Sequence, residues 1–352
     1  MRRVCAVLAA TISAVAYTLV LSATPVTAAT FDQVLEGARK EGRLFVLVSS
    51  PGKPETHAAV GKAFNERFGL QIRIEWTATN PVQTNSKIIA EQGGTGFVDV
   101  IGAGGNQEIN ALFERGLVKR YPWMETFGEK LPTLKNAVDP VIPDLAGAGL
   151  VIAHNVYGIG WNKDLIKDGE VPNTYAELLT PEWKGRFAVN AFSLNPMDYY
   201  SFDLGEEATL EMTKKTLANA PVLERGTGAV TGAISVGQTP VGISSFHQAG
   251  RVKNMGFKLF SDYIPIGVLQ IYVPENAPNP NTARLFSAWF ASEGMKLVNE
   301  MEPIPRIGEG SALDKMIAEV TARGGKIITE RSIADTNAAG AMRKKIADVM
   351  TK

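Results

Sequence analysis

The strongest constraint on the fold of this chain is an alternation of short apolar runs with helical patterns. The run 44–48 is apolar throughout, as expected of a strand buried in a parallel sheet. A helical pattern over 60–68 follows, and then an alternating strand pattern over 70–76. Another strand pattern at 98–101 completes a βαβαβ order, which predicts an α/β fold with helices on both faces of the sheet.

A second α/β unit is predicted over 139–254, where strand and helix patterns alternate again. Two later strand patterns return to the first sheet, so we expect the first lobe to comprise 30–138 and 255–325. The remaining tail, 326–352, is predicted to be a helical segment that packs on the lobes. The chain is long enough to bury a large core in two such lobes.

The first 29 residues have the order of a secretory signal: a basic start, an apolar run and small residues. We expect cleavage near Ala28 or Ala29 and export to the periplasm. An uncleaved membrane anchor stays open, because the apolar run approaches the length of a spanning helix. The single cysteine, Cys5, lies in this segment. The mature chain therefore has no disulfide, thiolate metal site or cysteine nucleophile.

Charge and motifs exclude several function classes. The sequence has 36 basic and 36 acidic residues, and loss of Arg2 and Arg3 leaves the mature chain near neutral. We therefore expect no nucleic-acid partner. Its three histidines show no metal-binding spacing, and the serines near His247 lack the nucleophile-elbow pattern. We expect no catalytic residues, no metal and no cofactor.

Four stretches resemble one known family. They are the strand 44–48 with its following loop and helix, residues 87–100, residues 160–185 with their P-x-T-x-x-E-L-L and P-x-W-K-G runs, and residues 303–306. The chain is similar to the periplasmic solute-binding proteins of ABC importers, in the family with the ferric-binding and hexose-phosphate-binding proteins. The resemblance implies a type II periplasmic-binding fold, in which two hinged lobes hold a solute in a cleft. It also implies an ABC permease as partner, and we expect a monomer.

The resemblance places the ligands of the ferric-binding members at residues that differ here. Their histidine matches Lys53, their glutamate matches a glycine near Gly104, and their tyrosine pair matches Phe246 and His247. These differences count against ferric iron held in the usual way. Because a lysine ammonium attracts anions, they favour a small, oxygen-rich, anionic solute. An ordinary solvated lysine and an ordinary surface histidine are the alternatives at two of these positions.

The loop over 191–201 supplies further candidates. Asn195 and Asp198 are good helix-capping residues, and Tyr199 could stack on a ligand or hydrogen-bond to it. Arg306 is a second candidate for contact with an anion, or a brace between the lobes. The full set of predicted ligand contacts is Ser49, Ser50, Lys53, Gly104, Asn195, Asp198, Tyr199, Ser245, Phe246 and His247.

Two other functions stay open at this point. The first is ferric iron uptake through a rearranged site that uses Tyr199, Tyr200 and His247. The second is a secreted hydrolase that uses Ser245 and His247.

Overall fold

The structure is a computed structural model that describes residues 29–49, 51–78, 81–91, 93–138 and 142–351. Ser50 and nearly all of the predicted signal segment lie outside the described residues. No helix within the described ranges has the length and apolarity that crossing a membrane requires.

The strands form a mixed sheet in the order β2-β1-β3-β9-β4-β7-β5-β6, with β8 and β10 beside this path. We call the part built around β1, β2 and β3 lobe 1, and the part built around β5, β6, β7 and β8 lobe 2. The strands are β1 (Arg43–Val48), β2 (Arg73–Ala78), β3 (Val100–Gly104), β4 (Leu150–Asn162), β5 (Phe187–Asn190), β6 (Val222–Glu224), β7 (Val241–Ser245), β8 (Met255–Lys258), β9 (Tyr263–Tyr272) and β10 (Lys326–Ile328).

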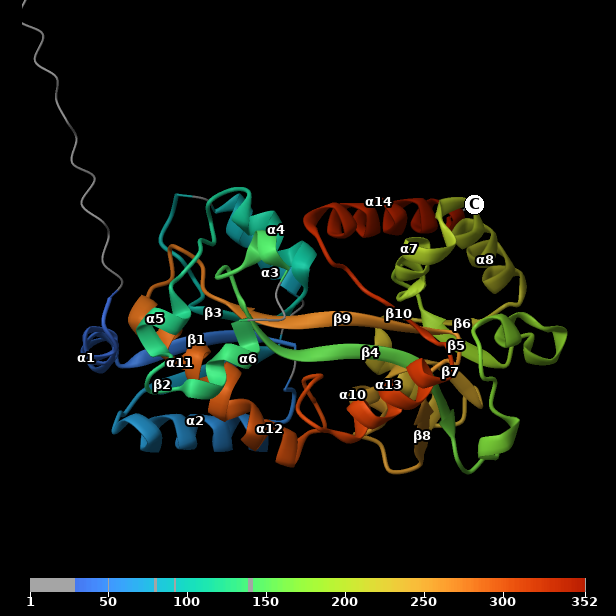
Figure 1. The fold of residues 1–352 in the computed structure, drawn as a ribbon, viewed down its shortest axis with the longest axis horizontal. Helices are drawn as coiled ribbons and strands as arrows, with labels where there is room; N and C mark the ends of the chain where they lie inside the picture. Colours follow the sequence, from blue (N-terminus) through green and yellow to red (C-terminus); the bar gives the residue numbers. More distant parts are fainter. Residues whose placement is uncertain (1–28, 50, 79–80, 92, 139–141, 352) are drawn as a thin grey trace, which may run out of the picture.

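Two long strands join the lobes. In Figure 1, β4 and β9 run side by side across the middle of the molecule. Residues 150–156 of β4 pair with β9, and residues 157–161 pair with β7 of lobe 2. Residues 270–272 of β9 pair with β3 of lobe 1. These hinge strands confirm the predicted two-lobe α/β fold.

Helices cover both faces of the sheet (Figure 1). Those in the lobe 1 half are α1 (Phe31–Glu41), α2 (Pro54–Phe68), α3 (Pro81–Ala90), α4 (Asn106–Phe113), α5 (Trp123–Phe127), α6 (Lys135–Val138), α11 (Pro280–Trp289) and α12 (Met295–Met301). The others are α7 (Ser201–Leu204), α8 (Glu206–Ala218), α9 (Thr227–Ser235), α10 (Phe246–Ala249), α13 (Ala312–Ala322) and α14 (Ile333–Met350).

Each lobe has its own apolar core. The lobe 1 core draws buried residues from 34–153 and 271–304, and it includes an aromatic cluster in which Phe64 packs edge-on against Phe286. The lobe 2 core draws buried residues from 157–260 and 328–346. Burial of side chains of this size is the main driving force for folding, at roughly 1.5–3 kcal/mol for each large side chain.

The parallel pairing of β1 with β2 and β3 agrees with the predicted βαβαβ order. Residues 150–162 form one long strand, β4, which pairs with strands of both lobes. Two local predictions differ from the structure. The strand β8 pairs with β4 and not with the first sheet. The tail is not helical throughout, since β10 pairs with β9.

The last helix, α14, lies across the top of the molecule in Figure 1 and bridges the lobes. It contacts α4 of lobe 1, and it also contacts α7 and α8 on the lobe 2 side. Met342 and Ile346 are buried in the lobe 2 core. On its lobe 1 side Gly340 leaves room for Gln107, since a Cβ at this position would lie 2.6 Å from the Gln107 amide nitrogen.

Candidate functional site

A cavity of about 150 Å³ lies between the lobes, against the hinge strands. Four parts of the chain form its wall: the start of α4, the two hinge strands, the loop after β5, and the C-terminal segment. The lining residues are Gly105, Asn106, Gln107, Glu108, Asn155, Tyr157, Asn195, Tyr199, Gly267, Val268, Leu269, Glu330 and Arg343. The start of α4 and the loop after β5 both follow the carboxyl ends of strands, where ligands bind in α/β sheets.

The lobe 1 wall begins where β3 ends and α4 starts. The Glu108 carboxylate accepts the backbone N–H of Gly105 at 2.9 Å, which caps the helix. The side chain of Asn106 is held from both sides, because its oxygen accepts from Gln270 at 2.7 Å and its nitrogen donates to Glu330 at 2.8 Å. This wall is therefore polar and fixed in position.

The hinge strands supply the floor. The Asn155 amide donates to the Tyr157 hydroxyl at 2.6 Å. Gly267 on β9 lies opposite Tyr199, and a Cβ there would lie 3.0 Å from the Tyr199 hydroxyl oxygen. A glycine at this position lets a lobe 2 tyrosine approach the hinge strand closely.

The lobe 2 wall comes from the turn of 3-10 helix at Met197–Tyr200 and the residues before it. Asn195 and Tyr199 line the cavity. Asp198, fully buried, accepts from the Arg343 guanidinium, with 2.7 Å between Nε and Oδ2. A buried, charge-assisted pair of this kind is strong while both partners are present.

Arg343 links the C-terminal segment to both lobes at the site. Its guanidinium reaches Asp198 of lobe 2 and donates to the Gln107 side-chain oxygen of lobe 1. It lies 3.8 Å from Glu330, which itself holds Asn106 of lobe 1. The C-terminal helix thus ties both lobes together at the cavity.

Burial sets the electrostatics of the cavity wall. Burial raises the pKa of Glu330, although hydrogen bonds from Asn106 and the charge of Arg343 act in the opposite direction. Burial, with the nearby carboxylates of Glu330 and Asp198, also raises the pKa of the Tyr199 phenol well above its ordinary value. Tyr199 is therefore a neutral phenol, able both to donate and to accept hydrogen bonds.

Some of the predicted ligand contacts lie at the cavity, and others lie away from it. Asn195 and Tyr199 line the cavity, and Asp198 lies directly behind Arg343. Gly104 packs against Tyr272, since a Cβ at Gly104 would lie 2.7 Å from the ring. The next residue, Gly105, lines the cavity. Ser49 is exposed. The ligand contacts remain predictions.

The loop that contains Lys53 already binds a carboxylate of the protein itself. The backbone N–H groups of Gly52 and Lys53 donate to Glu302 at 3.2 and 3.1 Å. Arg251 of lobe 2 contacts the same carboxylate at 2.6 Å. The Lys53 side chain is not part of the cavity wall. Arg306 donates to the Val151 and Ala291 carbonyl oxygens at 2.8 and 2.9 Å, both in the lobe 1 half of the molecule.

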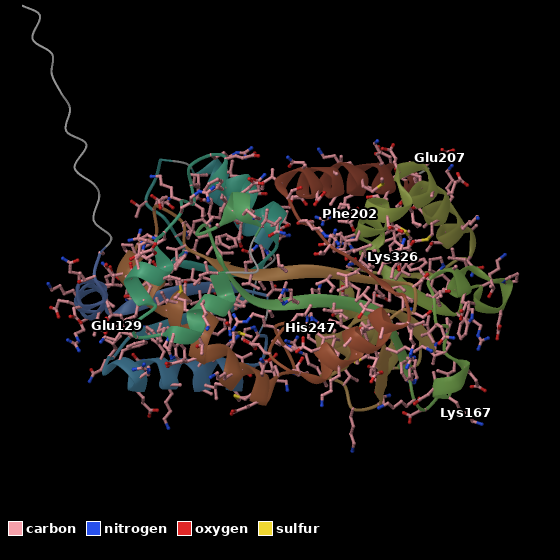
Figure 2. The ribbon with its side chains drawn as sticks, viewed as in Figure 1. Glu129, Lys167, Phe202, Glu207, His247 and Lys326 are labelled. Atoms are coloured by element: carbon pink, nitrogen blue, oxygen red, sulfur yellow. The ribbon has the colours of Figure 1, made fainter. Side chains whose placement is uncertain are left out.

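The residues after β7 lie outside the cavity wall. Figure 2 labels His247 near the middle of the molecule, and its ring nitrogens face Ser245 at 3.3 Å and the Gln248 amide at 3.1 Å. Phe246 packs edge-on against Phe257. Tyr200 is buried in the lobe 2 core, with its ring 5.6 Å from that of Tyr175. Tyr199, Tyr200 and His247 thus contact different neighbours.

Sequence reasoning did not find most of the cavity wall. The segment 106–108 follows a buried strand and a run of glycines, and this position at the carboxyl end of a strand was a usable signal. Asn155 and Tyr157 lie inside a strand pattern with no mark of function. Glu330 and Arg343 lie in the tail, where no sequence pattern indicates a contact with the cleft.

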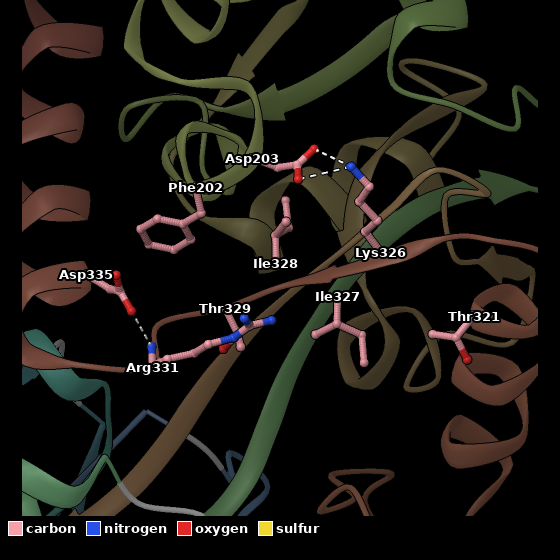
Figure 3. A pocket seen from close by; sticks show the side chains of 9 residues that line it. All are labelled: Phe202, Asp203, Thr321, Lys326, Ile327, Ile328, Thr329, Arg331 and Asp335. Atoms are coloured by element: carbon pink, nitrogen blue, oxygen red, sulfur yellow. Dashed lines mark hydrogen bonds and ion pairs between the residues drawn. The ribbon is translucent and has the colours of Figure 1, made fainter.

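A second pocket, of about 470 Å³, lies on the outside of the molecule between α7, α13, β10 and the start of α14. Figure 3 shows Asp203 facing Lys326, and their closest oxygen–nitrogen distance is 2.9 Å. Arg331 donates its backbone N–H to Asp335 in the same pocket. Residues of lobe 1 do not line this pocket, so it is not the interlobe site.

Comparison with known proteins assigns the family. Residues 59–296 match the model of the bacterial extracellular solute-binding proteins. This chain belongs to that family. No curated protein matches the sequence of this solute-binding protein significantly.

Solved structures with the same fold include iron-bound HitA from Pseudomonas aeruginosa, at 19% identity and a TM-score of 0.66, covering 86% of this chain and 99% of that one. AfuA from Actinobacillus pleuropneumoniae, with fructose-6-phosphate bound, is 17% identical with a TM-score of 0.65, covering 87% and 97%. PotD of a spermidine/putrescine ABC transporter from Streptococcus pneumoniae is 14% identical with a TM-score of 0.61, covering 86% and 98%.

Proposed function

We propose that this solute-binding protein captures a small polar solute in the cavity between its lobes and passes it to the permease of an ABC importer. One observation carries the proposal: both lobes, the hinge strand β4 and the C-terminal segment contribute polar side chains to one cavity, which β9 also lines. Closure of hinged lobes around a solute is a population shift that a membrane partner can recognise. Similar folds serve as substrate-binding components of ABC transporters in other organisms.

The place of action and the assembly follow from the same proposal. We propose that residues 1–29 are removed during export and that the mature chain works in the periplasm as a monomer. The order of basic, apolar and small residues supports removal, and membership of an extracellular family supports export. Mass spectrometry of the secreted chain tests the cleavage near Ala29. A mature chain that retains residues 1–29 would contradict it.

We propose that the protein is not an enzyme, because the Ser245 and His247 pair lacks what a hydrolase needs. Burial, with the charge of Arg251, lowers the pKa of His247 to about 3, which makes it a poor general base near neutral pH. The second ring nitrogen faces the Gln248 amide and not a carboxylate. Turnover of an ester substrate that His247→Ala abolishes would refute this.

Ferric iron is not the solute that we propose. Iron(III) binds phenolates, and burial raises the pKa of both Tyr199 and Tyr200 well above the ordinary value. The described residues contain no group of three or more histidine, cysteine, aspartate or glutamate side chains placed to hold a metal ion. A coloured ferric complex that Tyr199→Phe abolishes would revive the iron alternative.

Solute capture is tested by small-angle scattering and by mass spectrometry of the solute that purifies with the mature chain. We expect one solute at one equivalent, and a smaller radius of gyration with solute than without it. The variant Asn155→Ala should lose the solute. The control Glu206→Gln should keep it, since Glu206 is on the surface of lobe 2 and pairs there with Lys345. A solute retained equally by both variants would contradict the location.

A further inference from the structure

We propose that the solute carries a positively charged amine, and that the carboxylates of Asp198 and Glu330 with the side-chain oxygens of Asn155 and Asn195 select it. This inference rests on the proposed function, because it concerns the solute held by the same cavity. It replaces the anion that Lys53 led us to expect, since the Lys53 side chain does not line the cavity.

The charges at the cavity are unequal. Among the described residues that line it, Arg343 is the only cation, while Glu108 and Glu330 are acidic and Asp198 lies just behind. Each nitrogen of the Arg343 guanidinium already faces an oxygen of the protein, on Asp198, Gln107 or Glu330. The positive charge of Arg343 is therefore compensated within the protein, and a carboxylate remains in excess.

That excess is buried. The Glu330 side chain is 5% exposed and Asp198 is fully buried. An ionised carboxylate out of water is costly unless a cation compensates it. Burial also raises the pKa of Glu330, although Arg343 and the hydrogen bonds from Asn106 and Thr336 act to lower it. A bound cation would supply the missing compensation, whereas an anion would add to the repulsion.

The hydrogen-bonding groups agree with the charges. The side-chain oxygens of Asn155 and Asn195 and the Oδ1 atom of Asp198 are buried, and no described residue donates a hydrogen bond to them. A buried acceptor without a donor is destabilising, because it has lost its hydrogen bonds to water. An ammonium group offers three donors and no acceptor, so it complements these oxygens. A carboxylate or the dianion of a phosphate monoester offers only acceptors.

The preference for an amine does not depend on the orientation of the asparagine amides. Rotating the Asn155 amide would exchange its oxygen and nitrogen. The Asp198 carboxylate has no such ambiguity, because both of its oxygens accept when it is ionised. Burial raises the pKa of the phenols of Tyr157 and Tyr199, both in the cavity wall, and the charge of Asp198 raises the pKa of each further.

The size of the cavity restricts the solute. Its 150 Å³ corresponds to about five water molecules. Only a small amine fits without further opening of the lobes. The described residues offer no three-carboxylate or histidine cluster for a bare metal ion. A compact organic ammonium is thus the cation that the wall fits best.

The test is calorimetric titration of the mature protein with three matched sets of probes. The amines are ethanolamine, choline and putrescine, the neutral probes are ethylene glycol and 1,4-butanediol, and the anions are glycolate, succinate and inorganic phosphate. We expect saturable binding by an amine, and binding at least tenfold weaker by the neutral and anionic probes. Glu330→Gln should weaken the amine by about tenfold or more, since a charged hydrogen bond is lost.

Two further variants keep the outcomes distinct. Asn155→Ala should weaken any occupant of the cavity, whatever its charge, and Glu206→Gln should change nothing. Saturable binding of an anion or a diol that Asn155→Ala weakens and Glu330→Gln does not would overturn the amine and leave the proposed function standing. If no probe binds, the amine inference fails; if no solute purifies with the protein either, the proposed function fails as well.

Discussion

The bridge that Arg343 makes between α14, lobe 1 and Asp198 allows one quantitative prediction. The variant Arg343→Met keeps the length and the apolar stem of the side chain and removes its charge. It leaves the fully buried Asp198 carboxylate without its cation. Loss of one partner from a buried pair costs about 3–5 kcal/mol. Because the Arg343 side chain is 26% exposed, we expect the lower end, about 3 kcal/mol.

The assay is thermal unfolding of the mature chain followed by circular dichroism. For a chain of this size a loss of 1 kcal/mol lowers Tm by about 2 °C, so the variant should melt about 6 °C below the wild type. The matched control is Lys345→Met on the same helix. Its pair with Glu206 is about half exposed on both sides, and it should lose less than about 1 kcal/mol.

The double variant tests the cause. Adding Asp198→Asn to Arg343→Met removes the unpaired charge, and we expect it to recover about half of the lost Tm. The reasoning is wrong if Arg343→Met melts within 1 °C of the Lys345→Met control. It is also wrong if the double variant melts lower than Arg343→Met alone.

Three further predictions follow from the contacts described above. Glu302→Gln should cost about 3 kcal/mol by chemical unfolding, because Arg251 loses its buried partner; an unchanged midpoint would contradict this. Burial acts to raise the pKa of Glu302, but its hydrogen bonds and Arg251 lower it overall. The contribution of Glu302 to stability is therefore present above pH 4.5 and lost as the pH falls. The difference in free energy of unfolding between wild type and Glu302→Gln should narrow in acid. Gly267→Ala should weaken solute binding with little change in Tm, as its Cβ would crowd the Tyr199 hydroxyl. Phe64→Ala should lower the free energy of unfolding by about 3–5 kcal/mol, because Phe64 is fully buried among aromatic rings.

The sequence predicts much of the fold because its signals are local. The apolar run 44–48 becomes β1, paired in parallel with its neighbours as expected. The helical pattern over 60–68 lies within α2. Periodicity identifies such elements because one face of each must be buried.

The candidate site was only partly predictable, because its residues meet through long-range packing. Asn195 and Tyr199 were found because they lie in a loop after a strand. Arg343 reaches Gln107 across more than 200 residues of sequence, and no local pattern marks either one. Sequence alone does not show that the backbone N–H groups of Gly52 and Lys53 already bind the Glu302 carboxylate.

The position of Arg343 so near the end of the chain has a practical consequence. Only the last turns of α14 separate this side chain from the C-terminus, which Figure 1 marks beside lobe 2. A purification tag or fluorescent reporter attached after Lys352 would act on the same helix that holds Arg343 at the cavity. A fusion that should not change the affinity for the solute belongs before α1. A reporter of solute binding belongs after α14.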